Sequence, residues 1–269
     1  MLIKNLTTND AIIKHQQILT EIMRPATHSL FNNLNVQEKS NVLCLNCGEG
    51  DSVFHLADLV GKNGLVIGVD PIVENIQTAQ LLSQIKKLHN TDFCTIGQIS
   101  QKRELSFNFI HCRLPLIRSF DIEIILGQIE NQLIPGGVVV FDIINLSGFN
   151  SISKNFAFDR FLDIYTSFVR STWGSTSFSS YLNQLLVQSG FNQVQQRYSA
   201  PTFLRNSSKT LPSLTLECIL EEVLYKKQSS VDELQVLLYE LKNFEQNNYS
   251  LISLPGFHQI WGYKSETKE

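Results

Sequence analysis

Two glycines and an aspartate in the first third of the chain have the spacing of a nucleotide-binding site. Gly48 and Gly50 lie in a short turn after the apolar segment 42–45, and Asp70 follows a second apolar segment. A glycine turn lets the backbone approach a ligand closely, and an acid about 20 residues further on accepts hydrogen bonds from ribose hydroxyls. The turn lacks the third glycine of a dinucleotide fingerprint, so the pattern indicates another nucleotide. The alternative, a tight turn followed by a helix-capping aspartate, leaves this spacing unexplained.

A cysteine pair in the same turn offers two other chemistries. Cys44 and Cys47 form a C-x-x-C pair, which a redox centre or half of a zinc site would use. Zinc needs about four ligands, and the sequence contains no second C-x-x-C and no H-x-x-x-H pattern. The five cysteines are an odd number without framework spacing, which indicates reduced thiols. We therefore expect small buried residues at both positions and no metal site.

Strands and helices alternate around these residues. Short apolar segments predict strands, and apolar residues at helical spacing predict helices. The expected strands are 41–47, 64–70, 91–97, 107–114 and 136–144, and the expected helices between them are 51–61, 73–88 and 121–133. This alternation predicts parallel strands joined by right-handed crossovers, with helices on both faces. The glycine turn and Asp70 then lie at the carboxyl ends of neighbouring strands, where open α/β sheets bind ligands.

The regions on either side of this core are predicted to be mostly helical. Residues 9–34 have the spacing of an amphipathic helix, which Pro25 is expected to interrupt. The segment 148–174 is expected to be helical and is crowded with aromatic residues. The remaining predicted elements are helices at 179–191, 214–224 and 230–244 and strands at 192–200 and 256–264.

As an ordered set, these motifs resemble those of the class I S-adenosylmethionine-dependent methyltransferase family. "VLCLNCGEG" matches the family's glycine motif, "VIGVDP" the strand that ends in the ribose-binding acid, and "FCTIGQI" the adenine-contacting segment. "FNFIHCRLPL" is similar to the fourth strand, and "LIPGGVVVFD" to the "LKPGG" turn and fifth strand. "SGFNQVQ" and "FHQIWGYK" are similar to the segments of the sixth and seventh strands. The resemblance covers residues 41–142 well and the rest loosely, and it points to the family's quinone and natural-product branch.

The resemblance implies a fold and a domain plan. The fold would be an α/β, Rossmann-like, doubly wound seven-stranded sheet in the order 3-2-1-4-5-7-6, with the last strand antiparallel and with helical cap insertions. Because no linker separates the parts, we expect a single methyltransferase-like domain over residues 1–269. Its expected parts are an N-terminal helical segment 1–40, a cofactor-binding core 41–145 and cap insertions at 146–182 and 211–246.

The resemblance also implies a cofactor and its contacts. The cofactor would be S-adenosylmethionine, and the residues implied to bind it are Asn46, Cys47, Gly48, Gly50, Asp70, Pro71, Gln98, Ile99 and His111. The residues after the fourth strand face the transferred methyl group in this family, so His111 and Arg113 are the candidate catalytic residues. His111 would act as a base, and Arg113 would orient an acidic acceptor. The alternatives are a strand-end histidine satisfied by backbone and an ordinary surface ion pair. Arg24 lies in the segment that commonly closes over the cofactor, and the alternative is a solvated helix face.

Four positions depart from the family pattern, and three of them replace a carboxylate. Cys44 and Asn46 stand where the family has Asp and its first Gly, and Gln98 and Asn108 stand where Asp is common. A Gln carbonyl still accepts from an adenine amino group. Loss of one or two charge-assisted hydrogen bonds, about 1.5–3 kcal/mol each, would weaken cofactor binding without abolishing it.

The expected function is methyl transfer to a small, largely apolar or aromatic molecule, because the aromatic run lies where the family inserts substrate-capping helices. The net charge of −3 argues against a nucleic-acid partner. The chain shows no signal peptide and no apolar run near the ~20 residues that span a bilayer, so we expect a cytoplasmic protein with no membrane span. A homodimer is left open. Two alternatives also stay open: a non-catalytic methyltransferase-like partner or regulatory protein, and non-methylating use of the cofactor.

Overall fold

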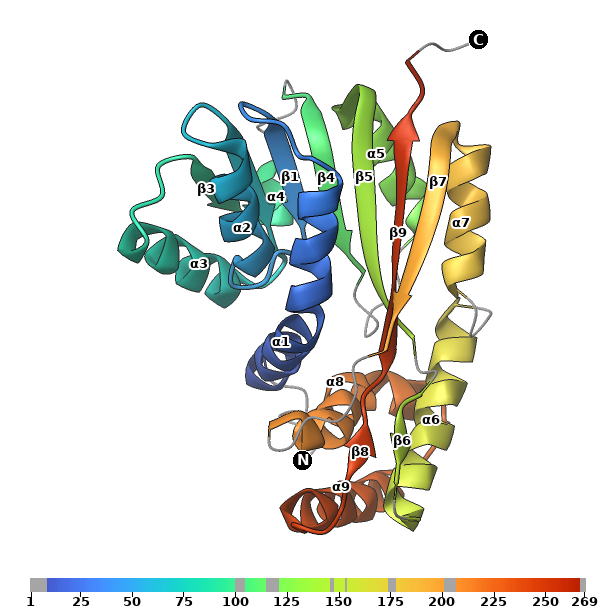
Figure 1. Cartoon of the computed structure of the whole chain (residues 1–269). Coiled ribbons are helices and arrows are strands. Elements are labelled where there is room, and N and C mark those ends of the chain that lie inside the picture. Colours follow the sequence, from blue (N-terminus) through green and yellow to red (C-terminus); the bar gives the residue numbers. More distant parts are fainter. Residues whose placement is uncertain are drawn as a thin grey trace.

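A seven-stranded sheet forms the centre of the structure, a computed structural model that describes residues 9–99, 105–114, 121–145, 148–152, 154–173, 178–200 and 207–266. The strand order is β3-β2-β1-β4-β5-β9-β7 (Figure 1). The strands are β1 (Asn41–Leu45), β2 (Leu65–Val69), β3 (Thr91–Cys94), β4 (Phe107–Arg113), β5 (Leu133–Asn145), β7 (Phe191–Ser199) and β9 (Gly256–Lys264). Strands β1 to β5 pair in parallel, and β9 runs antiparallel to β5 and β7. Since β7 and β9 are the sixth and seventh strands of this sheet, the predicted fold class, strand order and antiparallel last strand are confirmed.

Helices cover both faces of the sheet because successive strand residues point to opposite sides. Val42 and Cys44 belong to a core shared with α1, α2 and α3, whereas Leu43 belongs to a core shared with α5 and α7. The helices of these layers are α1 (Asn9–Asn33), α2 (Asp51–Val60), α3 (Val73–Ile85), α4 (Ile96–Ile99), α5 (Ile122–Gln132) and α7 (Phe178–Gln188). The result is a three-layer doubly wound domain.

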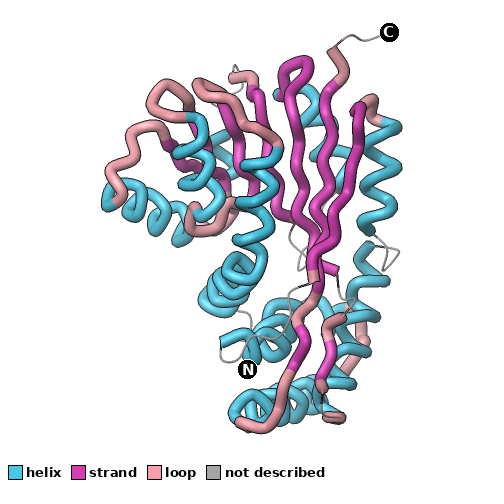
Figure 2. Tube along the Cα trace, viewed as in Figure 1, coloured by secondary structure: helices cyan, strands magenta, loops and turns pink. Residues whose placement is uncertain are grey.

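A separate helical layer lies beyond the carboxyl end of β5, at the bottom of Figures 1 and 2. It contains α6 (Phe156–Trp173), α8 (Leu211–Tyr225), α9 (Val231–Gln246), a 3-10 turn (Ser207–Thr210) and the two-stranded sheet of β6 (Asn150–Ser151) and β8 (Ile252–Ser253). The aromatic run builds the core of this layer, since Phe149, Phe158, Phe161, Tyr165 and Phe168 are buried and contact one another. Phe156 is exposed instead.

The prediction that Pro25 interrupts the first helix is wrong. Helix α1 continues through Pro25, although proline removes one backbone hydrogen bond and favours a kink. Figure 1 shows the helix changing direction along its length. Its far half packs Leu30 and Phe31 against the sheet, and its near half packs Ile12 and Ile22 into the helical layer. Tertiary burial on both sides therefore maintains a helix that local preference alone would end.

Two further details differ from the sequence-based expectation. Part of the segment 148–155, predicted as helix, forms strand β6, because Asn150 and Ser151 pair with β8 about 100 residues away in sequence. The cap of α9 forms as expected at Ser230, whose hydroxyl accepts from the Glu233 backbone N–H. The Glu233 carboxylate accepts from Arg160 and Ser229. In the part of the chain that the structure describes, no helix is both long and apolar enough to cross a membrane.

Substitution of two glycines by alanine should change the stability of the protein in opposite directions. A Cβ on Gly68 in β2 would lie 2.7 Å from the Phe93 ring and 3.0 Å from Cys47 Sγ, whereas a Cβ on Gly127 in the exposed part of α5 would meet nothing within 4 Å. We expect Gly68→Ala to lower the free energy of unfolding by about 1–3 kcal/mol through overpacking. Gly127→Ala should raise it by about 0.5–1 kcal/mol because alanine favours helix. Urea denaturation measures both, and an equal effect of the two substitutions would contradict this account of the core.

Candidate functional site

The glycine turn leaves β1 in the left-handed region of backbone space. Asn46, Gly48 and Gly50 have φ values of 53°, 55° and 95°. Asparagine tolerates this region better than most other residues, which explains how Asn46 replaces a glycine here. The turn is closed by a Gly50 N–H bond to the Cys47 carbonyl at 3.1 Å, and the Cys47 N–H donates to Val69 on β2 at 3.0 Å. The turn is thus fixed directly beside the end of β2.

Asp70 stands at that end of β2 and is fully buried. One carboxylate oxygen accepts from the Gly48 backbone N–H at 2.9 Å, and the other accepts from the Ile72 N–H and the Asn75 side chain, each at 3.0 Å. Asn75 also donates to Gln16 of α1 at 2.9 Å. Asp70 therefore ties the glycine turn to α3 and, through Asn75, to α1.

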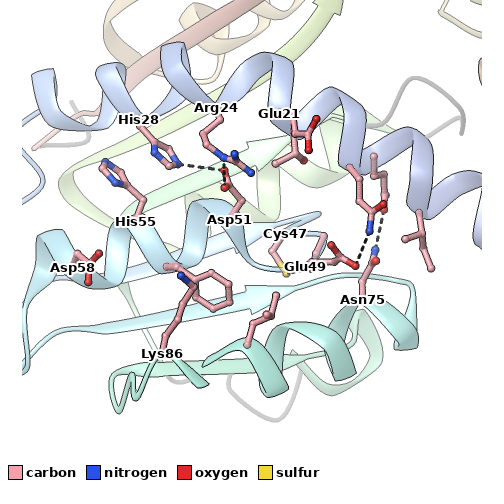
Figure 3. Close-up of a pocket in the computed structure, with 17 residues that line it drawn as sticks. Glu21, Arg24, His28, Cys47, Glu49, Asp51, His55, Asp58, Asn75 and Lys86 are labelled. Carbon is pink, nitrogen blue, oxygen red and sulfur yellow. Dashed lines mark hydrogen bonds and ion pairs between the residues drawn. The ribbon is translucent and has the colours of Figure 1, made fainter. Parts of the chain in front are cut away.

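Two cavities meet at the glycine turn, beneath α1. The larger, about 650 Å³, is lined from α1, α2 and α3 together with Cys47, Gly48 and Glu49 (Figure 3). The smaller, about 50 Å³, is mainly apolar and lies between α1 and the ends of β1, β4 and β5. Its walls are His15, Gln16, Leu19, Thr20, Met23, Asn46, Gly48, Arg113, Leu114 and Ile144. Gln16, Thr20 and Gly48 belong to both cavities, so the two spaces adjoin at the turn.

Polar side chains of α1 and α2 face one another across the larger cavity. Arg24 Nε donates to Asp51 at 2.6 Å, and His28 Nε2 lies 3.2 Å from the other Asp51 oxygen (Figure 3). His28 stacks on His55, with ring centroids 3.9 Å apart. Burial raises the pKa of Asp51, but the contacts with His28 and Arg24 outweigh it and lower the pKa. Of this cluster, sequence reasoning singled out only Arg24, because the partners of α1 are set by a long-range contact.

A second buried carboxylate, Asp142 at the end of β5, lies beneath the far side of α1. Its Oδ2 accepts from Thr27 at 2.9 Å and is 3.0 Å from His111 Nε2, and its Oδ1 accepts from Gln259 at 2.9 Å. Arg197 in turn donates to Gln259. Burial raises the pKa of Asp142, but His111, Arg113 and Gln259 outweigh it and bring the pKa to about 2. The buried group is therefore a carboxylate at neutral pH.

The two candidate catalytic residues both lie at the end of β4, but only one of their side chains lines a cavity. His111 is buried against Asp142 and the edge of Phe31 and lines neither cavity. Arg113 lines the smaller cavity, where its Nη1 donates to Thr20 at 2.7 Å. The Asn46 side chain donates to the Arg113 carbonyl at 2.9 Å and so joins the ends of β1 and β4.

Of the predicted cofactor contacts, Cys47 and Gly48 line the larger cavity and Asn46 and Gly48 line the smaller one, whereas Gly50, Asp70, Pro71, Gln98 and His111 line neither. Gln98 is exposed, and its carbonyl accepts from the Thr95 N–H and hydroxyl, so it caps the start of α4. Pro71 is exposed after β2. The Ile99 side chain lies outside the described part of the structure. Neither Gln98 nor Pro71 lines a cavity at the glycine turn.

The remaining departures from the family pattern have structural explanations. Cys44 and Cys47 are buried free thiols, and burial raises the pKa of both, so they are neutral. The described residues contain no group of three or more His, Cys, Asp or Glu arranged to hold a metal ion. The Asn108 side chain accepts from the Asn41 N–H at 2.9 Å and so holds the start of β1.

Comparison with known proteins agrees with this geometry. Residues 37–168 match the family model of a methyltransferase domain. The fold is similar to that of the YcgJ protein of Bacillus subtilis, with a TM-score of 0.57 and 16% identity over 90% of this chain and 99% of that chain. It is also similar to a precorrin-6y C5,15-methyltransferase of Geobacter metallireducens, with a TM-score of 0.52 and 9% identity over 90% of this chain and 87% of that chain. No curated protein matches the sequence.

The domain match, the strand order and the site at the carboxyl ends of the strands define the class of protein. Residues 37–168 form a methyltransferase domain with the fold of the class I S-adenosylmethionine-dependent methyltransferases, and the protein is an enzyme of this class. Its cofactor is S-adenosylmethionine. The narrower quinone and natural-product branch stays a prediction.

The glycine turn fits this cofactor at Gly48. A Cβ placed on Gly48 would meet no atom within 4 Å, so the backbone there faces open space that a ligand can enter. Asp70, which the family resemblance implies to bind the ribose, already accepts hydrogen bonds at both oxygens within the chain. If Asp70 binds ribose hydroxyls, they must displace or share the Gly48 N–H or the Asn75 amide.

The stability of the protein should depend on pH because of His15 in α1. It is buried 3.0 Å from Thr215 of α8, and burial lowers its pKa from 6.5 to about 4. Between these values the unfolded chain binds the proton and the folded chain does not, so stability falls as the pH is lowered from 7 to 4. A fall in the pKa of His15 from 6.5 to about 4 corresponds to about 3 kcal/mol of stability. The free energy of unfolding, measured by urea denaturation at each pH, checks this.

A matched pair of variants isolates the contribution of His15. His15→Gln keeps a polar group beside Thr215 but removes the titration, so its stability should fall less steeply between pH 7 and pH 4. His89→Gln, at an exposed position, should keep the wild-type dependence. If both variants retain the full loss, another group is responsible.

Proposed function

We propose that this methyltransferase transfers the methyl group to a small, largely apolar molecule held in the smaller cavity. The observation that carries the proposal is the pair of adjoining cavities. They share Gln16, Thr20 and Gly48, so a cofactor on the glycine turn and an acceptor in the apolar space would be neighbours. Leu19, Met23, Leu114 and Ile144 supply the apolar walls, which suit an acceptor of low polarity.

The chain contributes alignment and exclusion of water. When bound, S-adenosylmethionine supplies a methyl group on a positively charged sulfonium; the acceptor's electron pair forms the new bond to carbon while the carbon–sulfur pair stays on sulfur. Helix α1 covers the junction of the cavities through Gln16 and Thr20. Holding two reactants in line and away from water lowers the barrier to such a displacement.

His111 is best explained as a positioning residue. Its Nε2 is engaged with Asp142, and its ring is buried beneath Phe31. A general base must lie within hydrogen-bond reach of the proton it removes, and His111 lines neither cavity. We propose that His111 fixes the end of β4, from which Arg113 extends, rather than receiving a proton from the acceptor.

The remaining expectations about partners and location also belong to this proposal. The net charge of −3 supports a small-molecule acceptor over a nucleic acid. A cytoplasmic location and a homodimer stay predictions.

Substitution at Gly48 tests whether the glycine turn holds the cofactor. Gly48→Ala places a methyl group in the open space at the turn. Gly190→Ala is the matched control, since Gly190 also has a positive φ and nothing within 4 Å but lies at the end of α7. Both variants should lose about 1 kcal/mol of stability from backbone strain.

Only Gly48→Ala should weaken S-adenosylhomocysteine binding, by about tenfold or more, because a Cβ there occupies the space that the ligand needs. Isothermal titration calorimetry measures the affinities. Equal affinities for the two variants would contradict the assignment of the turn. Absence of binding to the wild type at about 1 mM ligand, the weak end of specific affinity, would overturn the proposed function itself.

A further inference from the structure

One edge of the Arg113 guanidinium group has no hydrogen-bond acceptor among the residues that the structure describes. Nη1 donates to Thr20, but Nε and Nη2 are buried and have no hydrogen-bond partner in the described part of the chain. The side chain is only 16% exposed. Buried donors are almost always satisfied, and leaving one unsatisfied is costly, more so for a charged group. An acceptor from outside the chain would satisfy the Nε and Nη2 donors of this edge.

Other arginines in the chain show what this edge normally does. Arg160 donates Nε and Nη2 to a single oxygen, Oε1 of Glu233, and Arg197 donates the same two nitrogens to Oε1 of Gln259. Arg24 donates its Nε to Asp51. The parallel N–H groups of this edge match the two oxygens of a carboxylate, which makes it the geometry of bidentate recognition.

Asp142 does not satisfy this edge. Its Oδ2 lies 4.0 Å from Arg113 Nη2, beyond hydrogen-bond distance, and that oxygen already receives Thr27 and faces His111. Its Oδ1 is taken by Gln259, which also binds Arg197. Arg113 and Arg197 are partly buried and Asp142 is fully buried, and the three side chains together carry a net charge of +1. One further negative charge would balance it.

Apolar side chains line the smaller cavity beside Arg113, together with the polar side chains of His15, Gln16, Thr20 and Asn46. Leu19, Met23, Leu114 and Ile144 share the smaller cavity with Arg113. The carboxylate of an apolar acid could thus bind the Arg113 guanidinium group while its hydrocarbon part contacts these apolar side chains. The cavity is small, but half of its lining comes from α1, so its size depends on where that helix lies.

We propose that the acceptor is an apolar carboxylic acid whose carboxylate binds the Nε and Nη2 edge of Arg113. This inference rests on the proposed function, since it names the chemical class of the molecule in the acceptor cavity. Arg113 is then the residue that selects acids over neutral molecules of the same shape.

Direct binding tests this without measuring methyl transfer. Butyrate and benzoate are the probes, each compared with its uncharged amide, and dissociation constants are measured by ligand-observed NMR. Each acid should bind wild-type protein about tenfold or more tightly than its amide, because a charge-assisted bidentate contact is lost in the amide. Equal affinity of acid and amide for the wild type overturns the proposal, and this comparison needs no variant.

Two variants locate the contact. Arg113→Gln should abolish the preference for the acids, whereas Arg160→Gln, which removes an arginine from an exposed ion pair, should preserve it. An acid preference that persists in Arg113→Gln overturns the assignment. Should Arg113→Gln fail to fold, Arg113→Lys keeps the charge without the fork, and the preference should fall at least severalfold; an unchanged preference would again overturn it.

The outcome also separates this inference from the proposed function. Binding of S-adenosylhomocysteine is measured independently by calorimetry. If it binds and the acids show no preference, the methyltransferase proposal stands and the acidic acceptor is excluded.

Discussion

The arrangement of the site depends on two buried carboxylates that hold α1 across the ends of the strands. Burying a charge is strongly unfavourable unless donors surround it. Asp142 receives donors from α1 and β9 and faces His111 on β4. Asp70 receives the glycine turn, α3 and, through Asn75, a link to α1. Since α1 supplies walls to both cavities, these two carboxylates help to fix the shape of the cavities, together with the apolar packing of α1.

The hydrogen bonds that Asp70 already accepts must be exchanged if a ribose hydroxyl is to bind there. Exchange of one hydrogen-bond partner for another changes the free energy little, whereas leaving a buried group without any partner costs about 1–3 kcal/mol. If a ribose hydroxyl replaces Asn75 at Asp70, the Asn75 amide still has Gln16 as an acceptor. The other N–H of Asn75 would then need a new acceptor, because the bond to Gln16 already exists alongside the bond to Asp70. If the cofactor binds Asp70, as the family resemblance predicts, its binding and the position of α1 are linked through Asn75 and Gln16.

The sheet could be predicted from the sequence because strands that are buried on both faces are continuously apolar, and because glycines mark the turns after them. The strand order, the glycine turn and the place of Asp70 were predicted from these local patterns and from the family resemblance. The partners of the site residues did not. Thr27 and Asp142 are 115 positions apart and Gln259 and Asp142 are 117 apart, and no local pattern encodes such a contact. Helix α1 passes through Pro25 for the same reason, since its partners lie in α8 and in the sheet.

Cys44 replaces a carboxylate of the family pattern, and this replacement changes the charges around Arg113. Burial raises the pKa of the Cys44 thiol and keeps it neutral, although the positive charge of Arg113 acts in the opposite direction. The family pattern has an aspartate at this position, which would add a second carboxylate to the charges that act on Arg113. With a thiol there, Asp142 is the carboxylate near Arg113, and it makes no hydrogen bond to the Nε and Nη2 edge. The substitution that weakens the family's cofactor motif would then be what leaves Arg113 free to bind an acidic acceptor.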